Sequence, residues 1–192
     1  MKSPITGSLS EQLLIAATKG EIRNVVEFAK QGGDVNYLSP EQGSNALFNA
    51  CRHNDLPMIN LLLELGCDVN QKMQIRYYAP PRKVGDDTAL HHVQSAEAAE
   101  LLLQTKAEIN AQDKNGNTPL MAATVNHYPP VVRKLLNSGA DFSCKNKKCQ
   151  TALDLAHARL SFWQTTSIKD DRRSDVIRDY LVIIKMLEEA KP

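Results

Sequence analysis

The sequence predicts an all-α solenoid built from stacked helix–turn–helix units. The first observation is a repeated order of signals: a helix start such as Thr118-Pro119-Leu120, a second apolar stretch such as Val131–Leu136, and a closing Gly139-Ala140-Asp141. This order recurs along the 192 residues, and the starts at Thr118 and Thr151 lie 33 residues apart. The second observation is composition: 42% of the residues are hydrophobic but only 5% are aromatic, which suits helices packed through Leu, Val and Ala. One helical hairpin cannot bury its apolar face alone, so such units stack around a continuous core.

The first predicted unit covers residues 10–36 and follows an N-terminal tail of residues 1–9. Ser10 is expected to cap its first helix, and Gly32-Gly33 to end its second helix with a left-handed turn. The unit has no Thr-Pro start, as expected of a capping repeat whose outer face meets water. The second unit covers residues 43–70 and opens its first helix at Asn45.

The third predicted unit, residues 86–110, departs from the regular spacing. Thr88 and Asn110 are only 22 positions apart, whereas the corresponding distance in the second unit is 25. Three residues are therefore missing from the first helix or its turn, and we expect that helix to be short. The joint before Thr88 spans 18 positions, against 8 in the next joint, which predicts a long finger over 71–87. We expect any specificity of this protein to lie in this region.

The fourth and fifth predicted units cover residues 113–143 and 146–189. Pro129-Pro130 is expected to begin the second helix of the fourth unit, because proline is tolerated in the first turn. The second helix of the fifth unit is expected over 175–189, after an insertion of about residues 160–174. The leucines expected in the common core are Leu47, Leu62, Leu90, Leu102, Leu120, Leu135, Leu153 and Leu181.

These residues resemble the ankyrin repeat family, and the resemblance covers about Ser10 to Glu189. It implies an ankyrin-repeat solenoid of stacked helix–turn–helix units with β-hairpin fingers that project sideways. It also implies that Thr88 and Thr118 cap first helices and that His91 bonds across to the neighbouring loop. In this family partners usually dock in the concave groove between the fingers and the first helices.

Mapping by position predicts which side chains meet a partner in that groove or at the fingers. The candidate partner-binding residues are Arg52, His53, Lys72, Arg76, Tyr77, Tyr78, Arg82, Lys83, Asp87, Lys114, Asn115, Asn117, Asn126, Lys145, Lys147 and Lys148. Ser44 is also expected to be exposed.

Three features of this surface carry alternative interpretations. Tyr and Arg dominate interface hot spots, so the finger with Tyr77 and Tyr78 is either a contact region or an insertion whose tyrosines fold back on the repeats. The lysines within 145–148 either meet an acidic partner or form a solvated charge run. Phe162-Trp163 either covers the end of the core or offers a hydrophobic contact, and we favour the first because an exposed pair would promote aggregation.

The residues that carry chemistry favour neither catalysis nor metal binding. Cys144 and Cys149 with His157 give only a weak metal-ligand spacing, and a turn explains the cysteines better. Asp86-Asp87 beside His91-His92 is the nearest approach to a polar cluster, although capping accounts for it. His91 is expected to be a scaffold residue and His92 to be exposed. There is no nucleophile elbow, phosphate-binding glycine loop or HExxH motif, so we expect no enzyme, no cofactor and no metal.

The leading hypothesis is a non-enzymatic protein–protein interaction module that acts as an adaptor, scaffold or inhibitor. The net charge of +1 disfavours nucleic acid, and no apolar run approaches the roughly 20 residues that span a bilayer. No signal peptide, F-box or SOCS-box segment is recognisable, so we expect a stand-alone, cytoplasmic binder that is monomeric when free. The alternatives are a bacterial effector or immunity-type protein that blocks an enzyme, and an enzyme with an unrecognised site.

Overall fold

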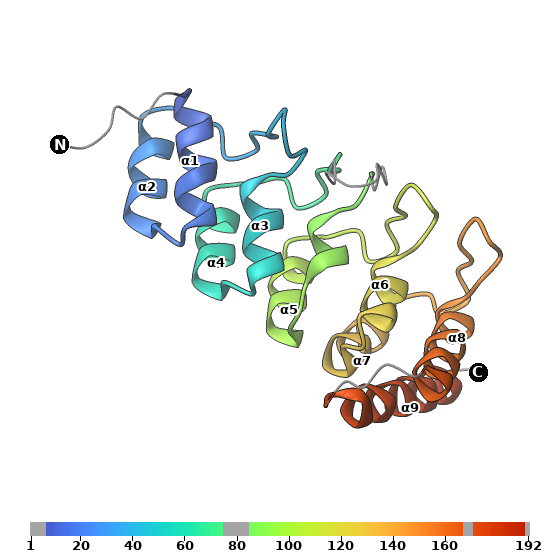
Figure 1. Cartoon of the computed structure of the whole chain (residues 1–192). Coiled ribbons are helices and arrows are strands. Elements are labelled where there is room, and N and C mark those ends of the chain that lie inside the picture. Colours follow the sequence, from blue (N-terminus) through green and yellow to red (C-terminus); the bar gives the residue numbers. More distant parts are fainter. Residues whose placement is uncertain (1–6, 75–84, 167–170, 191–192) are drawn as a thin grey trace.

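The computed structural model describes residues 7–74, 85–166 and 171–190, and within them the chain is a row of helical pairs (Figure 1). The pairs follow one another in chain order, so that the two ends of the chain lie at opposite ends of the row. The elements are α1 (Leu9–Thr18), α2 (Ile22–Lys30), α3 (Ala46–His53), α4 (Leu56–Glu64), the 3-10 helix η1 (Ala89–His92), α5 (Ala96–Gln104), α6 (Pro119–Val125), α7 (Pro129–Asn137), α8 (Ala152–Thr165) and α9 (Arg173–Glu189).

The helices form two layers with the core between them. The first helices α1, α3, η1, α6 and α8 contact one another in succession, and α4, α5, α7 and α9 do the same in the second layer. Six of the predicted core leucines are fully buried in this arrangement, from Leu47 in α3 to Leu135 in α7. The all-α solenoid predicted from the sequence is thus confirmed.

One repeated hydrogen bond joins the loops that follow the second helices. The side-chain oxygens of Asn36, Asn70 and Asn110 each accept a bond from a backbone N–H of the next unit, over 2.7–2.9 Å. A related bond lies within the first unit, where the hydroxyl of Ser10 accepts the backbone N–H of Asp34 at 2.9 Å. The three asparagine bonds tie the first four units to one another along the stack.

The start of α1 differs from the prediction. Ser8, rather than Ser10, is the N-cap, since its hydroxyl accepts the backbone N–H of Glu11 at 3.2 Å. Ser10 lies inside the first turn and is used for the bond to the next loop. Both serines fit the capping rule locally, and the contact made by Ser10 explains the difference.

The third unit has the shortened first helix that its spacing predicts. Its four-residue 3-10 helix η1 stands where the fourth unit has the seven-residue α6. The backbone becomes extended at Val93, which has a ψ of 142°, and Ser95 then caps α5. The start of α7 at Pro129 also follows the prediction.

The fifth unit differs most from its prediction. Residues 160–165, expected in an insertion, continue α8, which has 14 residues. Arg173 closes the end of α8, because its guanidinium donates to the carbonyl groups of Trp163 and Gln164 at 2.8 and 2.7 Å. Trp163 packs against the core as expected, whereas Phe162 is 49% exposed and does not cover it.

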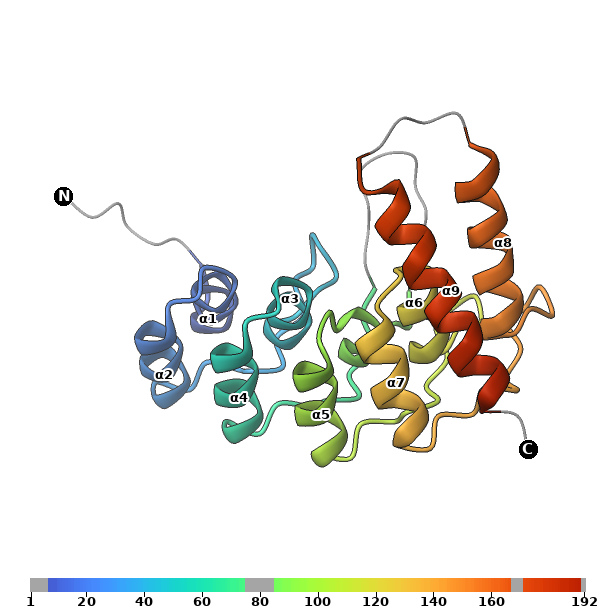
Figure 2. The ribbon, with the colours of Figure 1, turned by 90° about the horizontal axis from the view of Figure 1, so that it is seen from below.

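One residue of α9 also differs from the prediction, and both α8 and α9 extend beyond the helices of the earlier units (Figure 2). Leu181, which was expected in the core, is 51% exposed, whereas Tyr180, Ile183 and Leu187 of the same helix are buried. The Tyr180 hydroxyl donates to the Val125 carbonyl at 2.6 Å, so this face is fixed by a bond at the end of α6.

The fingers project to one side of the row (Figure 1). Within the described residues they contain no β-strand, although Met73 and Asp87 form an isolated antiparallel bridge at the base of the long finger. The backbone N–H of Met73 donates to the carbonyl of Asp87 at 2.8 Å. Residues 75–84 lie outside the described part of the chain, and with them Arg76, Tyr77, Tyr78, Arg82 and Lys83.

Candidate functional site

A groove of about 860 Å³ lies between the fingers of the third to fifth units and the helices η1, α6 and α8. We call it the finger groove. Its apolar lining comes from Met121, Ala122, Val125 and Leu155 of α6 and α8, and its polar lining comes from the finger turns and helix ends. The lining residues are Asp87, His91, His92, Asp113, Asn115, Asn117, Met121, Ala122, Val125, Asn126, Asn146, Lys147, Lys148, Gln150, Leu155 and Arg159.

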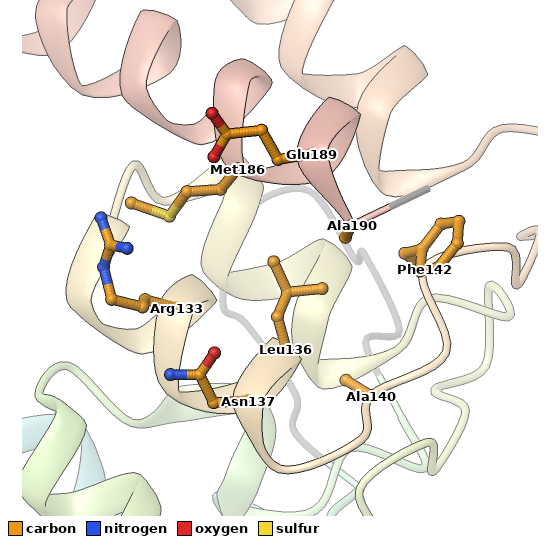
Figure 3. A pocket seen from close by; sticks show the side chains of 8 residues that line it. All are labelled: Arg133, Leu136, Asn137, Ala140, Phe142, Met186, Glu189 and Ala190. Atoms are coloured by element: carbon orange, nitrogen blue, oxygen red, sulfur yellow. The ribbon is translucent and has the colours of Figure 1, made fainter. Parts of the chain in front are cut away.

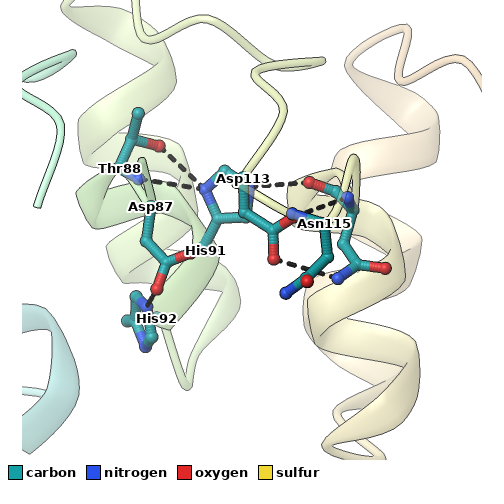
Figure 4. A network of polar contacts seen from close by, with 7 residues as sticks. Asp87, Thr88, His91, His92, Asp113 and Asn115 are labelled. Atoms are coloured by element: carbon teal, nitrogen blue, oxygen red, sulfur yellow. Dashed lines mark hydrogen bonds and ion pairs between the residues drawn. The ribbon is translucent and has the colours of Figure 1, made fainter. Parts of the chain in front are cut away.

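The fourth finger is held in shape by Asp113. One carboxylate oxygen accepts the backbone N–H groups of Asn115 and Asn117, each at 2.7 Å, and the other accepts the Asn117 amide at 2.9 Å (Figure 4). Gly116 has a φ of +78°, which glycine adopts without a steric cost. The turn is therefore closed from within by hydrogen bonds.

The fifth finger repeats this turn with Asn146 in place of the aspartate. The Asn146 side-chain oxygen accepts the backbone N–H groups of Lys148 and Gln150 at 2.9 and 3.0 Å. The turn is also bonded to the fourth finger, since the backbone N–H of Lys147 donates to the Asn115 carbonyl at 2.8 Å. These bonds hold the two fingers at a fixed spacing along one wall of the groove.

His91 connects the third and fourth units at the base of the groove. Its Nδ1 accepts the backbone N–H of Thr88 at 3.1 Å, so the ring proton lies on Nε2, which donates to the Asn117 carbonyl at 3.1 Å (Figure 4). Burial lowers the pKa of His91, while its bond to Asn117 and the charge of Asp87 oppose the shift. The ring is neutral and its two nitrogens are both in use, as expected of a scaffold histidine.

Asp87 is buried, although the sequence predicts an exposed partner-binding residue there. Its side chain bonds to His92 at 3.1 Å, and only 3% of the residue is exposed. The His92 ring packs edge-on against Phe48, with ring centroids 4.5 Å apart, and is itself only partly exposed. Packing of the third finger against the second unit explains the difference, and Ser44, predicted as exposed, is buried in the same region.

Three cations of the groove are exposed to solvent. The side chains of Lys147, Lys148 and Arg159 are exposed and make no hydrogen bond or ion pair with any described residue. Lys145 lies apart from them, close enough to Asp154 for its charge to help lower the pKa of that carboxylate, which the Thr151 hydrogen bonds lower most. The open positive charge of the groove is thus concentrated at its fifth-unit end.

The structure brings part of the predicted site together. Asn115, Asn117, Asn126, Lys147 and Lys148 line the finger groove together with the buried Asp87. The exposed residues that do not line it are Arg52, His53, Lys72, Lys114 and Lys145.

Leu155 and Arg159 are groove residues that the sequence interpretation missed. A signal for them was present, because Ala152, Ala156 and Leu160 mark the buried face of α8. Residues 155 and 159, also four apart, then fall on another face of the same helix.

A second cavity, of about 390 Å³, lies where α7 meets the end of α9 (Figure 3). Its lining includes Leu136, Phe142 and Met186 together with the charged Arg133 and Glu189. Its described lining includes none of the predicted partner-binding residues and no finger turn. We therefore regard the finger groove as the candidate site.

Neither metal chemistry nor a membrane span is found in the described residues. No group of His, Cys, Asp and Glu side chains there is arranged to hold a metal ion. No helix among them is both long enough and apolar enough to cross a bilayer.

Comparison with known families identifies the repeat. A family model described as "Ankyrin repeats (3 copies)" matches residues 76–146, and one described as "Ankyrin repeat" matches residues 42–71. The chain belongs to the ankyrin repeat family. Ankyrin repeats generally act as non-enzymatic interaction modules, so the chain is a protein–protein interaction module.

Individual relatives share the repeats over limited lengths. The chain is 30% identical to human "Ankyrin repeat and SOCS box protein 6" over 149 residues, which is 74% of this chain and 34% of that protein. It is 47% identical over 64 residues to rat "Oxysterol-binding protein-related protein 1", which is 33% of this chain and 7% of that protein. It is 36% identical over 61 residues to bovine "Protein fem-1 homolog C", which is 32% of this chain and 10% of that protein. The chain thus spans about a third or less of the length of these relatives.

Proposed function

We propose that this protein holds a segment of a protein partner in the finger groove, with no reaction of its own. The proposal rests on one observation: an apolar wall lies beside finger turns that are held in shape by their own hydrogen bonds. A surface ordered before binding loses little conformational entropy when the partner docks. An apolar centre with a polar rim is also the usual composition of a protein interface.

The long finger, residues 71–87, is the second part of the proposal. Its tyrosines and arginines are types that contribute strongly to interfaces, and its prolines limit the entropy lost on docking. The alternative is an insertion whose tyrosines fold back on the repeats. Replacing Tyr77 and Tyr78 with Ala distinguishes the two: weaker binding with unchanged stability supports a contact role, and unchanged affinity rules it out.

The role of the module is proposed to be that of an adaptor, scaffold or inhibitor, with residues 10–192 acting as one monomeric domain in the cytoplasm. The name of one relative joins ankyrin repeats to a SOCS box, which favours an adaptor. An effector or immunity-type protein that blocks an enzyme is the alternative, and the long finger would then cover the enzyme's cleft. Inhibition of the captured partner's activity by the purified chain would favour the inhibitor.

An enzymatic role has no support from the polar cluster of the third unit. Thr88 and His91 have the contact of a nucleophile and a base, with Thr88 Oγ1 3.0 Å from Nδ1. Thr88 is buried, however, and the Nε2 of the histidine is held by a backbone carbonyl. A substrate cannot reach the hydroxyl, so the pair acts as a helix cap.

The test uses one substitution in the groove and one outside it. Val125→Glu places a charge on the apolar wall, and Asn60→Glu places the same charge on the exposed side of α4, in the other layer. Affinity capture with wild type and both variants is followed by measurement of the purified partner's affinity for each. We expect Val125→Glu alone to lose binding; equal binding by all three proteins would exclude the groove.

A further inference from the structure

We propose that the partner segment in the finger groove is acidic and extended, with its carboxylates on Lys147, Lys148 and Arg159. This inference rests on the proposed function of the groove and adds the chemistry of what it binds. Three features support it: the charge of the two finger turns, the state of the groove carboxylates, and the position of the apolar wall.

The two finger turns have the same hydrogen bonds but different charges. In the fourth finger the turn is closed by Asp113, whose negative charge offsets Lys114. In the fifth finger Asn146 makes the equivalent bonds without any charge, while both Lys147 and Lys148 are present. The fifth turn therefore keeps the shape of the fourth but has two uncompensated positive charges.

The negative groups of the groove are already satisfied. Asp87 is buried against His92, and both carboxylate oxygens of Asp113 accept bonds from its own turn. The cations at the other end have no such partners among the described residues, and Arg159 of α8 adds a third charge to the two lysines. A docking segment thus meets free cations and occupied carboxylates, which favours Asp and Glu side chains.

The position of the apolar wall favours an extended conformation of the bound segment. Successive side chains of an extended chain point to opposite sides. Apolar side chains of the segment would then face Ala122, Val125 and Leu155, and the alternate acidic ones would face the cationic rim. The exposed amides of Asn115 and Asn126 are available to the backbone of the segment.

Nucleic acid is the competing polyanion, and the groove fits it less well. Among the described residues its lining contains no Phe, Tyr or Trp on which bases stack, and the chain as a whole has a net charge of only +1. Binding of a thymidine oligonucleotide is therefore included in the test as an outcome against the proposal.

The experiment selects short random peptides by display on the immobilised full chain and measures the enriched sequences as synthetic peptides. Each peptide is paired with a counterpart in which every Asp is Asn and every Glu is Gln. We expect enrichment of Asp and Glu, and binding by the neutral counterparts that is weaker by about tenfold or more at low salt. This comparison uses only wild-type protein, so it does not depend on the folding of a variant.

A charge-reversed protein locates the binding. The Lys147→Glu/Lys148→Glu/Arg159→Glu variant is expected to lose the acidic peptides. The Lys19→Glu/Arg23→Glu/Arg133→Glu variant makes the same change of net charge at exposed positions outside the groove and is expected to keep them.

The possible results separate the inference from the function on which it rests. Acidic peptides lost only in the groove variant support the inference. Neutral or basic peptides that Val125→Glu abolishes would leave the groove function standing and overturn the acidic partner. An oligonucleotide that binds the groove while acidic peptides do not would also overturn it. If no selected peptide responds to Val125→Glu, the groove function itself fails.

Discussion

Replacing His91 with Ala should destabilise the protein by about 1.5–4.5 kcal/mol. The buried N–H of Thr88 would lose its bond to Nδ1, and an unsatisfied buried donor costs about 1–3 kcal/mol. The Asn117 carbonyl would lose the bond from Nε2, which contributes about 0.5–1.5 kcal/mol because water can partly replace it. Both losses fall on the junction between the third and fourth units.

Urea denaturation followed by circular dichroism measures the change, with His53→Ala as the control. His53 is exposed, and such a substitution should stay within about 0.5 kcal/mol of wild type. Because stacked repeats can unfold in sections, hydrogen exchange of the amides in α5 and α6 should show the loss locally. If His91→Ala costs no more than the control, the histidine is not a scaffold residue and the account of the junction is wrong.

Three further predictions concern pH, backbone and thiols. Burial lowers the pKa of His91 below the 6.5 of the unfolded chain. The free energy of unfolding should therefore have its full value above pH 6.5 and fall as the pH drops from 6.5 towards the folded pKa. His91→Ala should flatten this pH dependence of the urea midpoint. Gly116→Ala should lower the free energy of unfolding more than Gly139→Ala in the same assay. Both glycines have positive φ, which costs an alanine about 1 kcal/mol. At Gly116 the added Cβ would also lie 3.1 Å from a backbone nitrogen, whereas at Gly139 the space is open. In the folded protein Cys149 should react with a disulfide reagent while Cys51, which is buried and whose pKa burial raises, should react only on unfolding; equal rates would contradict the burial.

Local signals in the sequence were sufficient for most of the fold. Asn45 caps α3, Thr118 caps α6 and Pro129 begins α7, and each depends only on its near neighbours in the chain. The missing residues of the third unit likewise predicted a short helix, because the chain between two fixed joints had too few residues for a full one.

Features that depend on packing between units could not be predicted in the same way. Asp87 looks like an exposed loop residue until the third finger packs on the second unit and His92 meets its carboxylate. Leu181 fits a helical stripe, but the side of α9 that packs is chosen by α7 and α8. The length of α8 was missed for a different reason: Leu160 and Trp163 were assigned to an insertion although they continue the helical spacing from Ala156.

The candidate site likewise contains residues that local sequence predicts and residues that depend on packing. Its finger residues were predicted because the turn sequence sets which side chains project, whereas its helix residues, Leu155 and Arg159, required the orientation of α8. Neither the sequence nor the structure identifies the partner, because a solenoid presents a binding surface and the molecule that binds there is a separate one.

The irregular third unit also affects the shape of the groove. In the fourth unit, Val125 and Asn126 at the end of α6 line the groove, but η1 ends at His92 and has no equivalent positions. The seven residues of α6 span about 10.5 Å at the rise of an α-helix, and the four residues of η1 span about 8 Å at the rise of a 3-10 helix, so the wall is shorter by about 2.5 Å. The chain then turns away at Val93, which is buried. The helical wall of the groove is therefore shorter in the third unit than in the fourth, and the missing part lies at the His92 end of η1, opposite the Thr88 end where the long finger joins the helix.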